Sequence, residues 1–278
     1  MIYLWDGVNS FRWQIVFSFI WKDRVLLQTQ KDILCEIKDD GLIDYKKAYE
    51  IQKRYVQKVQ QGHPSIIYVC EHPSVLTLGR SAMAEHILIS PEELNERGIE
   101  VLPIDRGGDI TLHAPGQLVI YPILDLQVFG KDLRAYLCKL EQVAIDLLNC
   151  FGIVAHRFDG KTGVWIGRKK IVSIGIGVRR WISYHGLAIN VNTDLALFSM
   201  IKPCGMDVKM TSMAQIKRGI IDMNEVKKRV ISNFCQAFGL TLKESGDDQG
   251  KFAVIESRLS ERGLCLREGA RHAKGCSP

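Results

Sequence analysis

The sequence lacks the patterns that mark several common protein classes. Its eight cysteines include no Cys-x-x-Cys pair and none at zinc-finger spacing from histidines, so we expect no metal site of that kind. The apolar run Trp13–Trp21 is too short to span a bilayer, and it lacks the basic start and cleavage site of a good signal peptide. No internal repeat and no low-complexity linker occurs. We therefore expect no metal and no membrane association.

A concentrated excess of basic charge is also missing. Of the net charge of +6, residues 1–31 contribute about +2 and residues 251–278 about +3, which leaves about +1 for the long middle of the chain. Such a distribution does not favour a nucleic-acid-binding face. The cysteines form no disulfide framework, and several lie inside apolar runs such as Ile67–Cys70, which favours a reducing, cytoplasmic setting.

The patterning within the chain of 278 residues mixes helices and strands without a repeating strand–helix–strand period. Ser90-Pro91-Glu92-Glu93 is a helix start, because serine caps, proline fits the first turn and Glu93 completes a capping box. Helices are expected at 42–61, 90–98, 133–148 and 222–238, and strands at 66–70, 75–78, 101–104, 109–113, 118–124 and within 153–192. We predict an α+β fold, with mixed sheets and flanking helices.

Three segments have the composition of a ligand-binding site. Paired glycines follow Arg106 and let the backbone approach a ligand closely, and Thr111 and His113 share one face of the strand that follows. Gly175 and Gly177 lack side chains and would leave a slot for a long chain, as would the small residues Gly186 and Ala188. The alternative for each segment is an ordinary tight turn followed by a strand.

Two side chains are candidates for chemistry. Lys170 follows the exposed turn residues Arg168 and Lys169 and opens an apolar run, so its side chain can point inward, where burial makes a lysine a useful base. Cys204 lies between a proline and a glycine and thus in a defined turn, unlike the other seven cysteines. A thiol reacts as the thiolate and needs a nearby base. Spacing alone does not pair Cys204 with Lys170, and most of the cysteines are expected to be structural.

Taken together, these segments resemble the lipoyl(octanoyl) transferase family from about Asp44 to Cys204. The resemblance is carried, in the family's order, by Glu71-His72-Pro73, Thr77-Leu78-Gly79-Arg80, Arg106-Gly107-Gly108, His113 with Pro115-Gly116-Gln117, Lys170 with Ser173-Ile174-Gly175, His185-Gly186-Leu187-Ala188 and Pro203-Cys204-Gly205.

The resemblance implies the fold of the biotin/lipoate protein ligase catalytic domain, with residues 32–245 as the octanoyltransferase domain, 1–31 as an N-terminal extension and 246–278 as a C-terminal tail. It implies that Cys204 carries the acyl group as a thioester and that Lys170 makes its thiol easier to deprotonate and serves as acid and base. The substrate-binding stretches that it implies are Arg106, Gly107, Gly108, Asp109, Ile110, Thr111, Leu112, His113, Ser173, Ile174, Gly175, Gly186, Leu187 and Ala188.

The implied reaction moves octanoyl from octanoyl-acyl carrier protein to a lysine of a lipoyl domain, either of the 2-oxoacid dehydrogenases or of the glycine cleavage H protein. No cofactor is expected, because exchange between thioesters is nearly isoenergetic and needs no ATP, and we expect a monomer. Three alternatives stay open: an ATP-dependent lipoate–protein ligase, a lipoyl amidotransferase that takes the acyl group from another lipoyl-bearing protein, and a non-catalytic paralogue that only binds carrier protein.

Two positions depart from the family's usual pattern. Ala114 stands where a glycine is usual, and Leu112 stands where an aromatic residue is more common. The position before a proline favours extended backbone, which alanine tolerates. We expect the methyl group of Ala114 to affect the length or width of the acyl slot more than the reaction.

Overall fold

The computed structural model of the chain describes residues 33–203 and 208–243. Cys204, the predicted extension 1–31 and the predicted tail 246–278 lie outside the described residues. The described elements begin at Ile33 and end at Leu242, and all of them lie within the predicted catalytic domain.

Two mixed β-sheets form the framework. The larger sheet has the strand order β11-β1-β2-β6-β10-β9-β8-β7 and the smaller one β4-β3-β5. The strands of the larger sheet are β1 (Ile33–Leu42), β2 (Ser65–Glu71), β6 (Gln117–Ile123), β7 (His156–Phe158), β8 (Lys161–Ile166), β9 (Lys169–Arg179), β10 (Ile182–Asn190) and β11 (Leu240–Leu242). Those of the smaller sheet are β3 (Val75–Leu78), β4 (Glu100–Pro103) and β5 (Ile110–His113). In each sheet parallel pairs, such as β1 with β2, adjoin antiparallel ones, such as β9 with β10.

The helices begin at the side-chain caps that the sequence provides. They are α2 (Tyr45–Gln60), α3 (Pro91–Glu96), α4 (Leu133–Cys150), α5 (Met213–Lys217) and α6 (Met223–Phe238). The side chains of Asp44, Ser90, Asp132 and Asp222 each accept a hydrogen bond from a backbone N–H of the first turn, which satisfies groups that the helix itself leaves unpaired.

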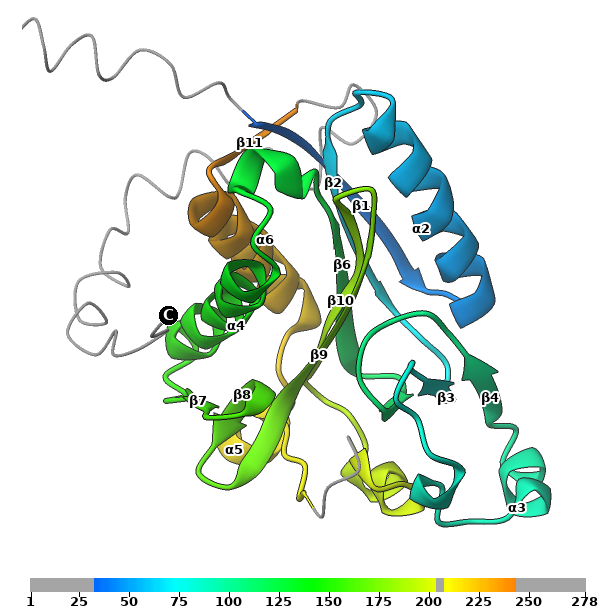
Figure 1. Cartoon of the computed structure of the whole chain (residues 1–278). Helices are drawn as coiled ribbons and strands as arrows, with labels where there is room; N and C mark the ends of the chain where they lie inside the picture. The colour runs from blue at the N-terminus through cyan, green and yellow to red at the C-terminus, as the bar shows by residue number, and fades with distance from the viewer. Residues whose placement is uncertain (1–32, 204–207, 244–278) are drawn as a thin grey trace, which may run out of the picture. The chain divides into compact units, whose positions relative to one another are not determined.

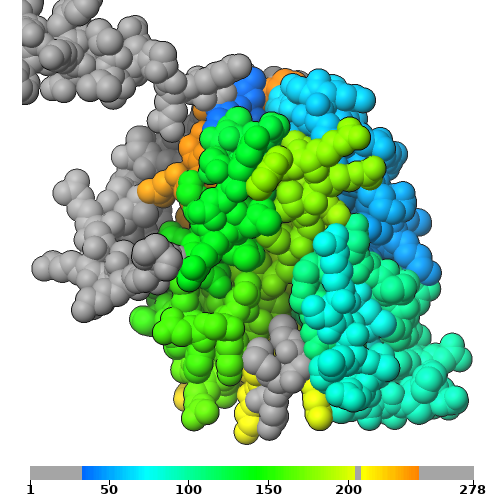
Figure 2. Space-filling view, in the orientation of Figure 1, coloured from blue at the N-terminus to red at the C-terminus, as the bar shows by residue number. Residues whose placement is uncertain are grey.

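The helices lie on opposite faces of the larger sheet (Figure 1): α2 covers one face, and α4 and α6 pack together against the other. On the α4 and α6 side a large apolar cluster contains Leu140, Leu147, Val230 and Phe234. On the α2 side a smaller cluster joins Ala48 and Val56 to residues of β2, β6 and β10. The smaller sheet has its own apolar core, and in the space-filling view its segments, in cyan and blue-green, pack beside the green strands (Figure 2).

The predicted α+β class and mixed sheets are confirmed, and so are the predicted helices, with small shifts at their ends. None of the helices found within residues 33–203 and 208–243 combines the length and apolar character needed to cross a bilayer.

Candidate functional site

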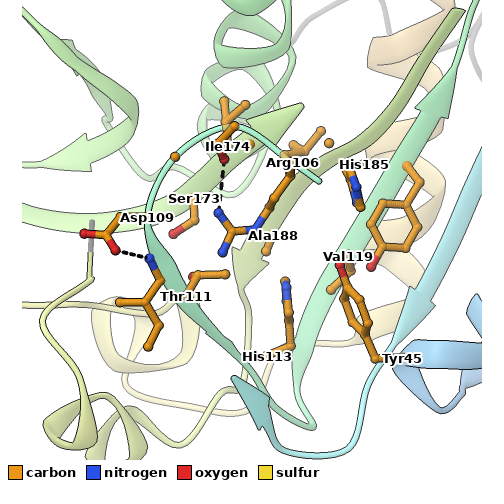
Figure 3. Close-up of a pocket in the computed structure, with 17 residues that line it drawn as sticks. Tyr45, Arg106, Asp109, Thr111, His113, Val119, Ser173, Ile174, His185 and Ala188 are labelled. Atoms are coloured by element: carbon orange, nitrogen blue, oxygen red, sulfur yellow. Dashed lines mark hydrogen bonds between the residues drawn. The ribbon is translucent and has the colours of Figure 1, made fainter. Parts of the chain in front are cut away.

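A narrow pocket of about 50 Å³ lies on the α2 side, between β5 and the strands β6, β10 and β9 of the larger sheet (Figure 3). Its lining is formed by Tyr45, Arg106, Gly107, Gly108, Asp109, Ile110, Thr111, His113, Val119, Tyr121, Ser173, Ile174, Gly175, His185, Gly186, Leu187 and Ala188. Thirteen of the fourteen residues predicted to bind substrate are in this set. Segments separated by 60 residues and more therefore meet at one cavity.

Leu112 is the exception, since it does not line the pocket. Thr111 and His113 on either side of it do, and successive side chains of a strand point to opposite faces. Leu112 is fully buried in the apolar core of the smaller sheet, together with Leu76 and Phe198. Leu112 therefore lies behind the strand and not in this pocket, and its size acts on the packing of the apolar core there.

The loop between β4 and β5, residues 104–109, crosses the larger sheet very closely. The N–H of Gly107 donates to the carbonyl oxygen of Ile176 in β9 at 2.8 Å. A Cβ on Gly175 would lie 2.9 Å from the carbonyl oxygen of Gly107, and one on Gly79 would lie 2.2 Å from that of Gly108. The glycines of the motif thus let backbone segments approach one another, which shapes the pocket indirectly.

Some small residues of β9 and β10 make room for other parts of the protein and not for a ligand. A Cβ on Gly177 would meet the ring of Tyr184 at 2.5 Å, so that glycine makes room for a tyrosine and the expectation that it forms the wall of a slot is wrong. A Cβ on Gly186 would come 2.3 Å from the carbonyl oxygen of Ile120, because β6 passes closely there. Ala114 is buried but does not line the pocket, so its methyl group does not narrow the cavity directly.

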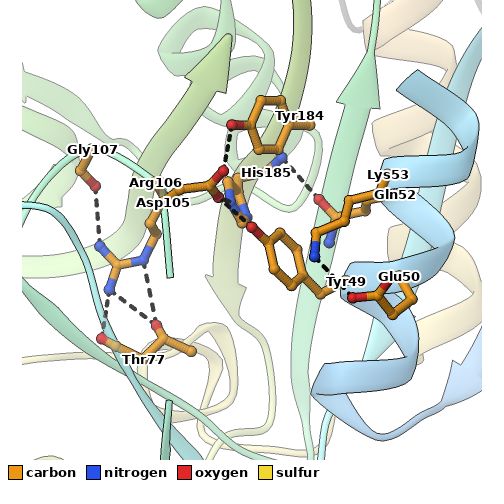
Figure 4. Close-up of polar contacts among 10 residues, drawn as sticks. All are labelled: Tyr49, Glu50, Gln52, Lys53, Thr77, Asp105, Arg106, Gly107, Tyr184 and His185. Carbon is orange, nitrogen blue, oxygen red and sulfur yellow. Dashed lines mark hydrogen bonds and ion pairs between the residues drawn. The ribbon is translucent and has the colours of Figure 1, made fainter. Parts of the chain in front are cut away.

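Arg106 ties the loop to the smaller sheet. Its Nε and Nη2 donate to Oγ1 of Thr77, and Nη2 also donates to the carbonyl oxygen of Thr77 at 2.7 Å (Figure 4). Because both partners are buried, these bonds resist exchange with water. The guanidinium therefore contributes to the pocket wall and holds the loop on β3.

Asp105 gathers three donors from α2 and β10 (Figure 4). Its carboxylate accepts from the hydroxyl groups of Tyr49 and Tyr184, at 2.7 Å each, and from Nε2 of His185 at 2.9 Å. The hydrogen bond from His185 is the largest influence that holds the pKa of Asp105 well below its usual range, and both tyrosine hydroxyls act in the same direction. Burial lowers the pKa of His185, so the ring is neutral and donates from Nε2.

A buried series of hydrogen-bonded side chains runs from the pocket to Thr211, whose backbone pairs with Lys170 of β9. Nδ1 of His113 donates to Oε1 of Gln117 at 2.8 Å, and Nε2 of Gln117 donates to Oδ1 of Asn190 at 2.9 Å. Nδ2 of Asn190 donates to the carbonyl oxygen of Thr211 at 3.1 Å. Burial keeps the pKa of His113 low, which fits its role as a neutral donor in this chain.

Lys170 is 1% exposed, as its position at the start of an apolar run predicted. Its Nζ lies 5.4 Å from the centre of the Trp165 ring, and its stem passes Gly163, where a Cβ would come 2.5 Å from Cε of the lysine. Lys169 beside it is exposed. Neighbouring side chains of a strand point to opposite faces, so Lys170 lies in the interior while Lys169 faces solvent.

The backbone of Lys170 pairs with the chain that returns after Cys204. Its N–H donates to the carbonyl oxygen of Lys209, and its carbonyl oxygen accepts from the N–H of Thr211, both at 2.9 Å. The fold therefore brings residues a few positions beyond Cys204 against the strand of Lys170, although the two stand 34 positions apart in the sequence. Cys204 itself lies outside the described residues.

Several residues of the site were not predicted. Tyr45, Val119, Tyr121 and His185 line the pocket, and Asp105 holds His185. Tyr45 and Val119 have the pattern of ordinary apolar positions in a helix and a strand. His185 belongs to the motif His185-Gly186-Leu187-Ala188, and Asp105 directly precedes Arg106. Within the described ranges, no group of three or more His, Cys, Asp or Glu side chains is placed to hold a metal ion.

Comparison with known proteins gives the family. Residues 44–235 match the family model described as "Lipoyl protein ligase A/B catalytic domain". An octanoyltransferase of Syntrophotalea carbinolica is 47% identical over 201 residues, which cover 72% of this chain and 92% of that protein. An octanoyltransferase of Solibacter usitatus is 43% identical over 206 residues, 73% of this chain and 93% of that protein.

Solved structures share the fold at low sequence identity. Protein Ta0514 of T. acidophilum, with bound lipoic acid, superposes with a TM-score of 0.63 at 16% identity, covering 83% of this chain and 96% of that one. Lipoate-protein ligase A bound with ATP gives a TM-score of 0.60 at 15% identity, covering 83% of this chain and 95% of that one. With the predicted fold confirmed and relatives above 40% identity over most of the chain, the protein belongs to the lipoyl protein ligase A/B catalytic-domain family and, within it, to the octanoyltransferases.

Proposed function

We propose that this chain transfers an octanoyl group from octanoyl-acyl carrier protein to the ε-amine of a lysine on a lipoyl domain, through a thioester on Cys204. The observation that carries the proposal is the convergence of the predicted substrate-binding segments on one pocket, which extends along the strand that holds the buried Lys170. The octanoyltransferases that resemble the chain over most of its length support the choice of acyl group.

The first half of the proposed reaction loads the enzyme. Lys170 takes the proton of the Cys204 thiol, and the thiolate attacks the carbonyl carbon of the donor thioester. A new carbon–sulfur bond forms to Cys204, the bond to the carrier's sulfur breaks, and the carrier leaves as a thiol after it takes a proton from Lys170. Because one thioester replaces another, the step needs no ATP.

The second half delivers the octanoyl group. The lipoyl domain's lysine attacks the Cys204 thioester as a free amine, the amide bond forms, and the thiolate of Cys204 leaves. Lys170 takes the proton that the attacking amine releases and can return it to the thiolate. Amide formation from a thioester is downhill, so this half makes the overall transfer favourable.

Intact-mass spectrometry tests the proposal. The protein is incubated with octanoyl-acyl carrier protein without ATP, and a lipoyl domain is then added. We expect one octanoyl adduct on the enzyme, its disappearance on addition of the lipoyl domain, and no adduct on Cys204→Ala. An adduct of undiminished yield on Cys204→Ala would exclude this cysteine as the nucleophile.

The same experiment separates the alternatives. Transfer that strictly requires free acid and ATP would identify a ligase, and transfer only from an octanoylated lipoyl-bearing protein would identify an amidotransferase. Binding of carrier protein with no adduct under any condition would identify a non-catalytic paralogue.

A further inference from the structure

The residues of β10 that line the pocket run from Ala188 to His185, and His185 has no part in the proposed reaction. Along the paired strands, Ser173 stands opposite Ala188 and Gly175 opposite Gly186, and His185 follows one residue further. Lys170 lies on β9 three residues before Ser173, at the other end of this path. The side chain of Lys170 reaches forward along β9, since a Cβ on Gly163 would meet both its Nζ, at 3.1 Å, and the carbonyl oxygen of Val172, at 2.6 Å. An acyl group whose carbonyl lies near this amine therefore extends past Ser173 and Ala188 toward His185.

The backbone of His185 turns its ring onto the pocket side. Its φ is +54°, in the left-handed region that residues with a side chain seldom adopt. Strand alternation would place neighbouring side chains on opposite faces, yet both Tyr184 and His185 reach Asp105. The N–H of His185 donates to Oε1 of the buried Gln52 at 2.9 Å, which fixes this conformation from α2.

The ring itself is held rigidly. It stacks on Tyr49, with the ring centres 5.4 Å apart and the planes 17° apart, and its Nε2 donates to Asp105. Asp105 is fixed in turn by the hydroxyl groups of Tyr49 and Tyr184. A ring held by a charge-assisted hydrogen bond and by stacking does not swing aside to admit a longer ligand without losing both contacts.

The spacing fits an eight-carbon chain. From Ala188 to His185 is three residues of strand, or about 10 Å. An extended eight-carbon chain measures about 9 Å, from carbon–carbon bonds of about 1.5 Å. We propose that His185 is the stop that limits acyl-chain length and that Asp105 is the positioning residue that holds this stop in place, an inference that rests on the proposed octanoyl transfer.

A series of donors tests this proposal. Transfer to a lipoyl domain is measured with hexanoyl, octanoyl, decanoyl and dodecanoyl carrier proteins, and kcat/KM is compared for the wild-type protein and His185→Asn. Asparagine tolerates the left-handed backbone and keeps a polar group, but it is too short to fill the space of the ring. We expect the ratio of decanoyl to octanoyl kcat/KM to rise at least about tenfold in the variant, since one or two methylenes in a closed pocket discriminate by about that factor.

Two further variants keep the outcome interpretable. Asp105→Asn keeps the His185 side chain but replaces the carboxylate that holds its ring. We expect the ratio of decanoyl to octanoyl kcat/KM to rise by a smaller factor than in His185→Asn. His63→Asn makes the identical change at an exposed histidine just after the C-terminal end of α2 and should leave the ratio unchanged. Thermal unfolding of each variant shows whether it is folded at the assay temperature.

The outcomes are distinguishable. If octanoyl transfer by His185→Asn falls and transfer of the longer chains falls in parallel, the ring supports only the structure and the proposed stop is wrong. An unchanged ratio in both His185→Asn and Asp105→Asn would also overturn it, while octanoyl transfer by the wild-type protein still stood. A wild-type protein that transfers no octanoyl from any carrier would instead remove the proposed function, and the stop with it.

Discussion

The two ends of the strand pair β9–β10 carry histidine and lysine side chains that are equally buried but differently supported. At the Lys170 end the amine lies near the ring of Trp165, and the strand pairs with the chain that returns after Cys204. At the His185 end the ring lies in a cluster of tyrosines around one carboxylate. Under the two proposals made above, the first end takes part in the reaction and the second end limits the length of the acyl chain.

The largest effect is expected at the chemical end. Lys170→Met removes the amine but nearly preserves the volume of the buried side chain, so the fold should persist. We expect acyl-adduct formation to slow by about 10²- to 10⁴-fold, the usual contribution of a general acid–base group. Quenched-flow mass spectrometry gives the rate, and Lys169→Met, at the exposed neighbour, should be within about twofold of wild type. An equal loss of rate in Lys170→Met and Lys169→Met would show that the buried amine has no special role in adduct formation.

A second effect concerns stability at low pH. Burial lowers the pKa of His72 to about 4, from the usual value of 6.5 in the unfolded chain. Between these values the unfolded chain binds a proton that the folded chain does not, so the free energy of unfolding is highest above pH 6.5 and falls as the pH drops toward 4, by up to about 3 kcal/mol.

Chemical denaturation at pH 7 and pH 4.5 measures this loss, and His72→Gln should flatten the dependence. The low pKa values of His113 and His185 add to the loss in the same direction, so the variant keeps part of it. A variant with the full wild-type dependence would show that His72 titrates normally in the folded protein.

A smaller effect on stability is expected where Gly79 packs against the loop between β4 and β5. Gly79→Ala would bring a Cβ within 2.2 Å of the carbonyl oxygen of Gly108, so the loop must shift. We expect a loss of about 1–3 kcal/mol in the free energy of unfolding, as for other overpacked sites, together with a raised KM for the donor. Gly107→Ala is the control for stability, because its Cβ would lie at an ordinary 3.5 Å from the nearest atom. Equal destabilisation by both would contradict the close approach seen at Gly79.

The smallest effect is expected from Tyr184→Phe. It removes one of the three hydrogen bonds to Asp105 and leaves the bond from His185 in place. We expect a loss of about 1 kcal/mol or less in the free energy of unfolding, because Asp105 is partly exposed and water can replace the hydroxyl group. Thermal unfolding measures it. A loss as large as that of Gly79→Ala would mean that the cluster is more cooperative than its exposure indicates.

Much of the fold followed from local signals. Ser90 does cap α3, and the stripe from Leu133 to Leu148 does form α4, because capping and helical periodicity act within a few residues. The inward orientation of Lys170 also followed from its place at the head of an apolar run. That Leu112 lies in the core and that Gly177 makes room for the ring of Tyr184 did not follow from the sequence, because both depend on packing partners from other elements.

By itself the sequence determined the elements, the family resemblance and the residues that carry it, because these are properties of short segments in a fixed order. Only the tertiary structure decided that Lys170 pairs with the chain beyond Cys204, and that His185 lines the pocket. The first depends on hydrogen bonds to Lys209 and Thr211, and the second on a left-handed backbone held by Gln52 and on the carboxylate of Asp105. Those contacts join residues from 39 to 133 positions apart, and no local pattern specifies which distant groups a strand will meet.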